Sequence, residues 1–146
     1  MIVDTHNPQR ANAAIKSIFH HVGIVPTQQR LQIARAILSH PQHLSAEQLL
    51  ALVNQNGANV SKATVYNTLG LFARKGLVRE VLVDPDRVLF DSNTEPHFHL
   101  YNEDTGALSD FNAAHLLPAP PELPAGTTLV DIDVIVRIRN SRASVD

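Results

Sequence analysis

The sequence contains no cysteine and no tryptophan, and its aromatic residues are limited to five Phe and two Tyr. Without cysteine neither a disulfide nor a thiolate zinc site can form, so any metal site must use His, Asp or Glu. No apolar run approaches the roughly 20 residues that a membrane helix needs. Residues 1–6 lack the basic and apolar regions of a signal peptide. We therefore expect a cytoplasmic protein without a membrane partner.

Charge is distributed unevenly along the chain. Residues 1–80 carry eight Lys/Arg and three Asp/Glu, a balance of +5, whereas residues 81–146 carry four and eleven, a balance of −7. A basic half joined to an acidic half suits a polyanion-binding domain attached to a domain with another task. Chance clustering of surface charge would give the same pattern, so the asymmetry decides nothing alone.

The first half of the chain has the periodicity of helices. Apolar residues recur at helical spacing in residues 7–21. Thr27 and Ser61 each precede a further helical pattern, as N-cap residues do. The sequence Ser-Ala-Glu-Gln at residues 45–48 has the form of a capping box. Four helices are therefore expected before Gly76.

After Gly76 the pattern changes to short β segments. Residues 77–83 and 87–90 flank Asp84-Pro-Asp86, which is a turn signal. Helices followed by such a hairpin make a winged helix-turn-helix. The pattern predicts this domain over residues 1–84, followed by a hinge over residues 85–92.

Residues 93–146 are expected to be a second domain, rich in strands. Residues 97–102 and 107–111 suit a hairpin, and residues 127–138 form a long β-branched run. Prolines in residues 117–126 exclude regular structure between them.

The helix expected after Ser61 carries side chains suited to DNA in its first two turns. The candidates are Ser61, Lys62, Thr64, Tyr66 and Asn67, with Arg30 of the second helix as a backbone contact. Hydroxyls and Lys can bind phosphates, a Tyr ring can touch thymine methyl groups, and Asn can pair with adenine. An ordinary capped helix, or a winged protein-interaction module, would also fit this pattern.

A set of His and Asp residues suits a divalent metal. His97 and His99 stand at i and i+2 on an extended segment, so their imidazoles share one face. Asp91 and Asp110 flank them, and His43 is a further candidate. Three imidazoles and two carboxylates suit Fe(II), Mn(II) or Zn(II).

A rival pattern overlaps this set. The spacing His97-x-His99-x-x-x-Glu103 resembles the metal motif of cupin barrels, which would imply a metal-dependent oxygenase. A cupin needs a β-barrel on both sides of the motif, and the preceding ninety residues are mostly helical in pattern. We therefore favour a protein that is not an enzyme.

Several motifs together resemble the ferric uptake regulator (Fur) superfamily from about residue 13 to residue 111. They are Thr27-x-Gln-Arg30, His43-Leu-Ser-Ala-Glu47, Ala63-Thr-Val-Tyr-Asn-Thr-Leu69, Gly76-Leu-Val78, Phe90-Asp91 and His97-x-His99. The resemblance implies an α+β homodimeric repressor, with an N-terminal winged helix-turn-helix domain and a small C-terminal α/β dimerisation domain. It also implies an AT-rich palindromic operator and one regulatory Fe(II) or Mn(II) per chain.

Within that superfamily the chain most resembles the peroxide-responsive (PerR) branch. Tyr66-Asn67 and the run Asn93 to His99 match that branch, and so do the spacings of the five candidate ligands. The last ligand is Asp110, whereas iron-uptake regulators usually have Glu. The resemblance implies that bound Fe(II) reacts with hydrogen peroxide and that His43 or His97 is oxidised. The alternative is the iron response regulator (Irr) branch, which senses haem through a histidine-rich version of this motif.

The chain departs from the superfamily where a structural zinc site is usual. Asn102 and Thr105 occupy the places of the first Cys-x-x-Cys pair, and Arg137-Ile-Arg139 stands near the second. No structural zinc held by four cysteines is expected, and packing must hold the dimerisation domain together instead.

Overall fold

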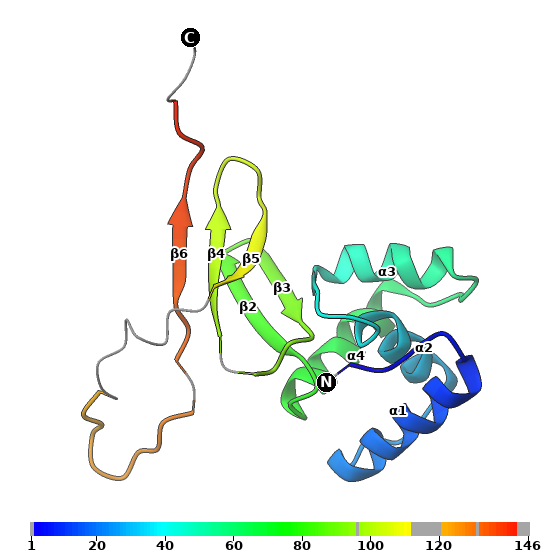
Figure 1. The fold of residues 1–146 in the computed structure, drawn as a ribbon. Helices are drawn as coiled ribbons and strands as arrows, with labels where there is room; N and C mark the ends of the chain where they lie inside the picture. Colours follow the sequence, from blue (N-terminus) through cyan, green and yellow to red (C-terminus); the bar gives the residue numbers. More distant parts are fainter. Residues whose placement is uncertain (1, 96, 112–120, 131, 143–146) are drawn as a thin grey trace. The chain divides into compact units, whose positions relative to one another are not determined.

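The computed structural model describes residues 2–95, 97–111, 121–130 and 132–142. The chain divides into two compact units, Met1–Thr94 and Glu95–Asp146. Helices are confined to the first unit in the described part of the chain, and each unit has its own three-stranded sheet (Figure 1). The α+β class expected from the sequence is confirmed.

Four helices make up most of the first unit: α1 (Pro8–Val22), α2 (Gln28–Ile37), α3 (Ala46–Gln55) and α4 (Lys62–Arg74). Their starts follow the predicted caps. Thr27 accepts a hydrogen bond from the Arg30 N–H, and Ser61 accepts one from the Thr64 N–H. The capping box of α3 is complete, because Ser45 and Gln48 bond each other's backbone N–H groups.

The chain ends α1 with a left-handed residue. Gly23 has a φ of 79°, and its N–H donates to the Phe19 carbonyl. Glycine adopts this conformation without the steric cost that a Cβ brings, so the helix stops here.

The sheet of the first unit has the strand order β1-β3-β2. β2 (Arg79–Asp84) and β3 (Arg87–Asp91) form the predicted hairpin, and the Asp84 side chain accepts the Asp86 N–H in its turn. β1 (His43–Leu44) was not predicted; it pairs antiparallel with β3. Helices α3 and α4 followed by this hairpin form the winged helix-turn-helix.

The core of the first unit joins all four helices to the sheet. Its fully buried side chains include Ile15 and Phe19 of α1, Ile33 and Ile37 of α2, Leu49 of α3, and Val65, Leu69 and Phe72 of α4. Phe90 of β3 belongs to the same cluster. This apolar contact fixes α4 by one face and leaves its other face exposed.

The second unit contains β4 (Phe98–Asn102), β5 (Leu108–Phe111) and β6 (Ile135–Ile138), in the order β5-β4-β6. β4 pairs antiparallel with β5, so that His99 lies opposite Asp110, and parallel with β6.

The strand expected over residues 127–138 is therefore much shorter than predicted. β-Branched residues favour a strand only where a neighbour pairs with them, and β4 offers partners for four residues. No helix occurs in the part of this unit that the structure describes, so the α component of the expected α/β domain is not seen there.

The boundary between the units falls after Thr94, beyond the hinge expected over residues 85–92. Most of that range is β3, which is held on both sides by β1 and β2. Residues 112–120 lie outside the described residues, and with them part of the proline-rich stretch; residues 121–126 form no helix or strand.

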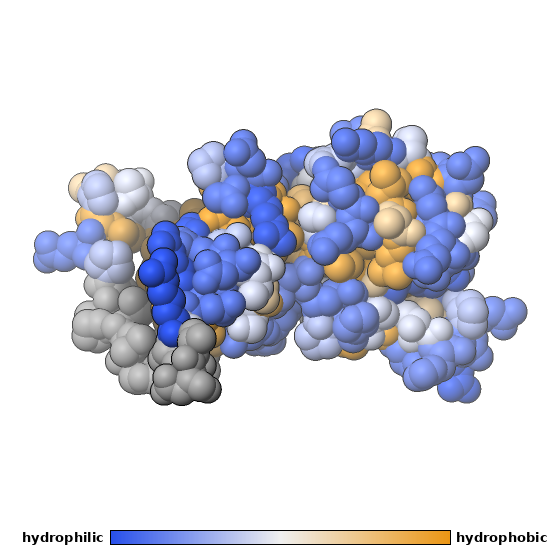
Figure 2. All heavy atoms as spheres, turned by 90° about the horizontal axis from the view of Figure 1, so that it is seen from above, coloured by the Kyte–Doolittle hydropathy of each residue, from blue (hydrophilic) through white to orange (hydrophobic). Residues whose placement is uncertain are grey.

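Hydrophilic residues cover most of the face drawn in Figure 2, with hydrophobic residues in patches between them. Among the described residues, no helix combines the length and apolar character needed to cross a membrane.

Candidate metal centre and nucleic-acid interface

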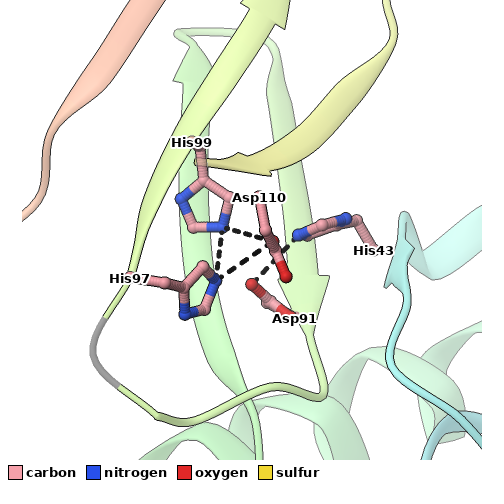
Figure 3. Close-up of side chains that lie close together, drawn as sticks. All are labelled: His43, Asp91, His97, His99 and Asp110. Atoms are coloured by element: carbon pink, nitrogen blue, oxygen red, sulfur yellow. Dashed lines mark hydrogen bonds and ion pairs between the residues drawn. The ribbon is translucent and has the colours of Figure 1, made fainter. Parts of the chain in front are cut away.

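The first unit brings together two of the predicted ligands. His43 of β1 and Asp91 at the end of β3 are Cα partners in the sheet. The His43 Nε2 atom lies 3.0 Å from the Asp91 Oδ2 atom (Figure 3). Asp91 is fully buried, and its other oxygen accepts the Asn93 N–H at 2.9 Å. A buried carboxylate needs charged or polar partners, and a metal ion with an imidazole beside it is such a partner.

Ser92 holds β1 in the register that this pair requires. Its hydroxyl donates to the His40 carbonyl at 3.0 Å and accepts the Gln42 N–H at 3.0 Å. The Ser92 N–H donates to the Gln42 carbonyl at 3.1 Å. The Gln42 side chain in turn donates to the Ala36 and Ile37 carbonyls at the end of α2. Ser92 therefore ties the segment before His43 to the strand that ends at Asp91.

The second unit brings together the other three predicted ligands: His97 just before β4, His99 of β4 and Asp110 of β5, whose side chains point toward one another in Figure 3. The Nε2 atoms of His97 and His99 lie 2.9 Å apart, and their rings meet edge to face with centroids 4.5 Å apart. The Asp110 Oδ1 atom lies 3.3 Å from the His97 Nε2 atom and 3.8 Å from that of His99.

The spacing of these atoms fits neighbouring ligands on one ion. Ligand nitrogens about 2.1 Å from a metal stand roughly 3 Å apart from each other. The His97 Nδ1 atom lies 2.5 Å from the Glu95 carbonyl oxygen, which leaves the Nε2 atom to face Asp110. Metal-binding histidines usually use their second nitrogen in this way. The second unit therefore offers a suitable half-site for a divalent cation.

Helix α4 exposes the predicted DNA-reading side chains to different degrees. Lys62, Tyr66 and Asn67 are exposed, while Val65, Thr68 and Leu69 of the opposite face are buried. Ser61 and Thr64 also contact each other, with hydroxyl oxygens 2.9 Å apart, so both hydroxyls serve the start of the helix. Arg30 is half-buried, and its guanidinium donates to the Val25 carbonyl at 2.8 Å.

The Tyr66 hydroxyl donates a hydrogen bond to the Glu47 carboxylate of α3. This bond lowers the pKa of Glu47 below its ordinary value, and it raises the pKa of Tyr66. The Lys62 Nζ atom stands over the Tyr66 ring, 5.8 Å from its centroid.

A polar cluster fills the region where the superfamily usually has its cysteines. We call Asn102, Glu103, Asp104, Arg139 and Asn140 the clasp. Asn102 donates to the Asn140 side chain at 2.8 Å, and the Asn140 N–H donates to Asp104 at 2.7 Å. The Arg139 Nε atom donates to Glu103 at 2.9 Å. The clasp therefore joins the β4–β5 turn to the segment after β6 without a metal.

Ser92 and Glu47 were missed as functional candidates from the sequence. Ser92 follows Asp91 directly, but its role depends on residues about fifty positions earlier. Glu47 was considered only within a motif. Its contact with Tyr66 spans two helices, and no spacing rule along one helix could reveal it.

Comparisons with known proteins agree with the fold and with the motifs. The family model described as "Ferric uptake regulator family" matches residues 21–137. A curated relative, the peroxide-responsive repressor PerR of Staphylococcus aureus (strain Mu50), is 34% identical over 94 residues, which are 64% of each chain. The chain thus spans somewhat less than two thirds of the curated relatives it matches.

Solved structures give the same result. The ferric uptake regulator of Pseudomonas aeruginosa, determined with manganese, has a TM-score of 0.70 and 26% identity, over 87% of this chain and 98% of that one. The peroxide stress regulator of Campylobacter jejuni has a TM-score of 0.59, over 90% of this chain and 97% of that one. At 21% identity the second likeness shows the fold alone.

The match over residues 21–137 and the shared fold show that this chain belongs to the ferric uptake regulator family.

Proposed function

We propose that this chain is a metal-responsive, DNA-binding transcriptional repressor that acts as a homodimer. The observation that carries the proposal is the presence of two ligand groups, His43 with Asp91 and His97 with His99 and Asp110, in a member of this family. Helix α4, with Lys62, Tyr66 and Asn67 exposed, is the proposed DNA-reading element. Family membership argues against the oxygenase that the His97, His99 and Glu103 spacing also allowed.

The proposed metal site uses both groups for one divalent ion per chain, Fe(II) or Mn(II), with Zn(II) as a substitute. The nitrogen and oxygen ligands fit these ions, and the two carboxylates balance the charge of a divalent cation. An ion that bonds to both groups restricts the angle between the units, and hence the spacing of the two α4 helices in a dimer. Metal and DNA binding are then coupled, by about 1–3 kcal/mol in typical cases.

Selection from a random library of double-stranded DNA tests this function. The protein loaded with Mn(II) should enrich an AT-rich inverted repeat. Removing the metal should weaken binding to that duplex by at least about fivefold. His99→Ala should have the same effect, whereas His20→Ala, at an exposed position of α1, should not. Equal DNA affinity with and without metal would contradict the proposal.

We propose further that the signal is hydrogen peroxide. Fe(II) held by these ligands would catalyse the reaction of one hydrogen peroxide with the imidazole of His43 or His97: the ring would gain one oxygen atom, and the other oxygen of the peroxide would leave as water. The PerR relative and the aspartate at position 110 support this choice over iron uptake. Loss of one imidazole from the ligand set weakens metal binding, and DNA is released as a result.

Mass spectrometry after mild peroxide treatment of the Fe(II)-loaded protein tests the signal. A peptide that contains His43 or His97 should gain the mass of one oxygen atom, and DNA binding should fall. Asp110→Glu should keep metal binding while reducing the sensitivity to peroxide. Unmodified peptides with DNA still bound would favour the haem-responsive alternative, which titration with haem then tests directly.

A further inference from the structure

We propose that Glu47 is a positioning residue for Tyr66, and that it sets how strongly α4 discriminates thymine from other bases. The inference rests on the proposed DNA-binding function and deepens it. Glu47 does not contact DNA in this proposal; it acts through the orientation of the Tyr66 ring.

The hydrogen bond to Glu47 holds the Tyr66 side chain at its hydroxyl end. Tyr66 lies in the second turn of α4 with 42% of its surface exposed, so packing leaves its ring free to move on the outer side. Its hydroxyl donates to the Glu47 carboxylate, which comes from the first turn of α3. The ring is thereby attached to two helices, one through its backbone and one through its hydroxyl.

The position of Glu47 is itself well fixed. The capping box of Ser45 and Gln48 surrounds it, and Ala46 and Leu49 beside it are buried. Lys62, one turn before Tyr66, stands over the ring and limits the space on that face. The Tyr66 ring is therefore ordered before DNA arrives, and an ordered contact residue loses less conformational entropy when it binds.

The negative charge of Glu47 suits a role in the sequence selectivity of DNA binding rather than in its overall affinity. A carboxylate beside a DNA-reading helix repels phosphates and lowers affinity for every sequence. Glu80 of β2 carries the same charge and lines the same hollow of about 280 Å³ as Glu47 and Tyr66. The Tyr66 hydroxyl bonds only the Glu47 carboxylate of these two. Glu80 is therefore a matched control for the effect of charge alone.

A double-mutant cycle tests the inference. The probes are the duplex enriched from the random library, the same duplex with deoxyuridine in place of thymidine, and a scrambled duplex. Deoxyuridine lacks only the methyl group that a tyrosine ring can contact. Glu47→Ala and Tyr66→Phe should each lower the preference for the enriched over the scrambled duplex about three- to tenfold, as expected when one more side chain must be ordered on binding. The double variant should lose no more of this preference than either single variant.

The remaining variants separate orientation from charge. Glu47→Gln keeps an oxygen that accepts the hydroxyl, so it should retain the preference for thymidine over deoxyuridine. Glu80→Ala should change affinity for the enriched and the scrambled duplex by the same factor. Circular dichroism should confirm that each variant remains folded.

Two results would overturn the inference while leaving the proposed function intact. One is additive losses in the double variant, and the other is an unchanged preference for thymidine in Glu47→Ala. A library that yields no enriched duplex would overturn the proposed function, and the inference with it.

Discussion

The two units of this chain are held together by different kinds of contact. The first unit buries one large apolar cluster that joins four helices to a sheet. In the described part of the second unit, the buried apolar side chains are Phe98 and Tyr101, and polar contacts of the clasp join its ends. A small unit with so little apolar burial gains most from a partner surface or a bound ion. The apolar cluster thus stabilises the first unit from within, whereas the unit with the His97, His99 and Asp110 group depends more on such a partner or ion.

The largest expected effect comes from the core of the first unit. Phe72 is fully buried and its ring lies 5.5 Å from that of Phe19, centroid to centroid. Phe72→Ala should lower the free energy of unfolding by about 3–5 kcal/mol, measured by urea denaturation of the helical circular dichroism signal. Leu82→Ala, at a position 62% exposed, should stay within about 0.5 kcal/mol. Similar losses for both variants would show that the buried apolar cluster is not what stabilises the first unit.

Ser92→Ala should have a smaller effect on stability and a clear effect on metal binding. The change leaves the half-buried Gln42 N–H without its acceptor, which costs up to about 1–3 kcal/mol. It also loosens the register that faces His43 toward Asp91, so Mn(II) affinity should fall about tenfold by calorimetry. The control is Ser39→Ala, which removes a hydroxyl bonded to the Ala36 carbonyl. Equal Mn(II) affinities in both variants would show that Ser92 serves stability alone.

The clasp of the second unit should be sensitive to salt. Glu103→Ala removes the partner of Arg139, so amide hydrogen exchange in β6 should become faster. The difference from the unchanged protein should shrink at about 1 M salt, where the Debye length is about 3 Å. Glu122→Ala, also at an exposed position, should leave β6 unchanged. A difference that persists at high salt would mean that packing rather than charge holds this strand.

The smallest expected effect concerns pH and the Tyr66–Glu47 hydrogen bond of the first unit. This bond lowers the pKa of Glu47. The stability that it contributes to the folded protein is therefore complete above the ordinary pKa of 4.5, and it is lost as pH falls through the lower pKa of the folded protein. The bond also raises the pKa of Tyr66. On this side its contribution to stability is complete below the ordinary pKa of 10.0, and it is lost as pH rises through the higher pKa of the folded protein. The ratio of DNA affinities between the unchanged protein and Tyr66→Phe should therefore be constant from about pH 5 to pH 9. A step near neutral pH would assign the dependence to histidine instead.

Local signals predicted the first unit well. The caps at Thr27, Ser45 and Ser61 act within four residues, so a short stretch of sequence contains the whole interaction. β1 escaped prediction because two residues make no pattern, and its strand partner lies almost fifty positions away.

The second unit was harder to predict for the same reason. The β-branched run over residues 127–138 suggests a long strand, yet among its described residues the strand covers Ile135–Ile138 alone. The five metal candidates were visible as residue types, and the structure groups them as a pair and a trio. The roles of Ser92 and Glu47 depend on contacts between distant segments, which a single sequence does not encode in any short pattern.

Because of the clasp, the fold of this 146-residue chain does not depend on a zinc–thiolate site that a chelator or an oxidant can destroy. A structural thiolate zinc couples the integrity of a fold to metal supply and to thiol oxidation. Here amide, carboxylate and guanidinium groups make the corresponding connection, and the chain has no thiol to oxidise. A metal buffer or a peroxide pulse applied to this protein therefore has no zinc–thiolate site to damage, so any effect on the proposed DNA binding can be assigned to the proposed metal site.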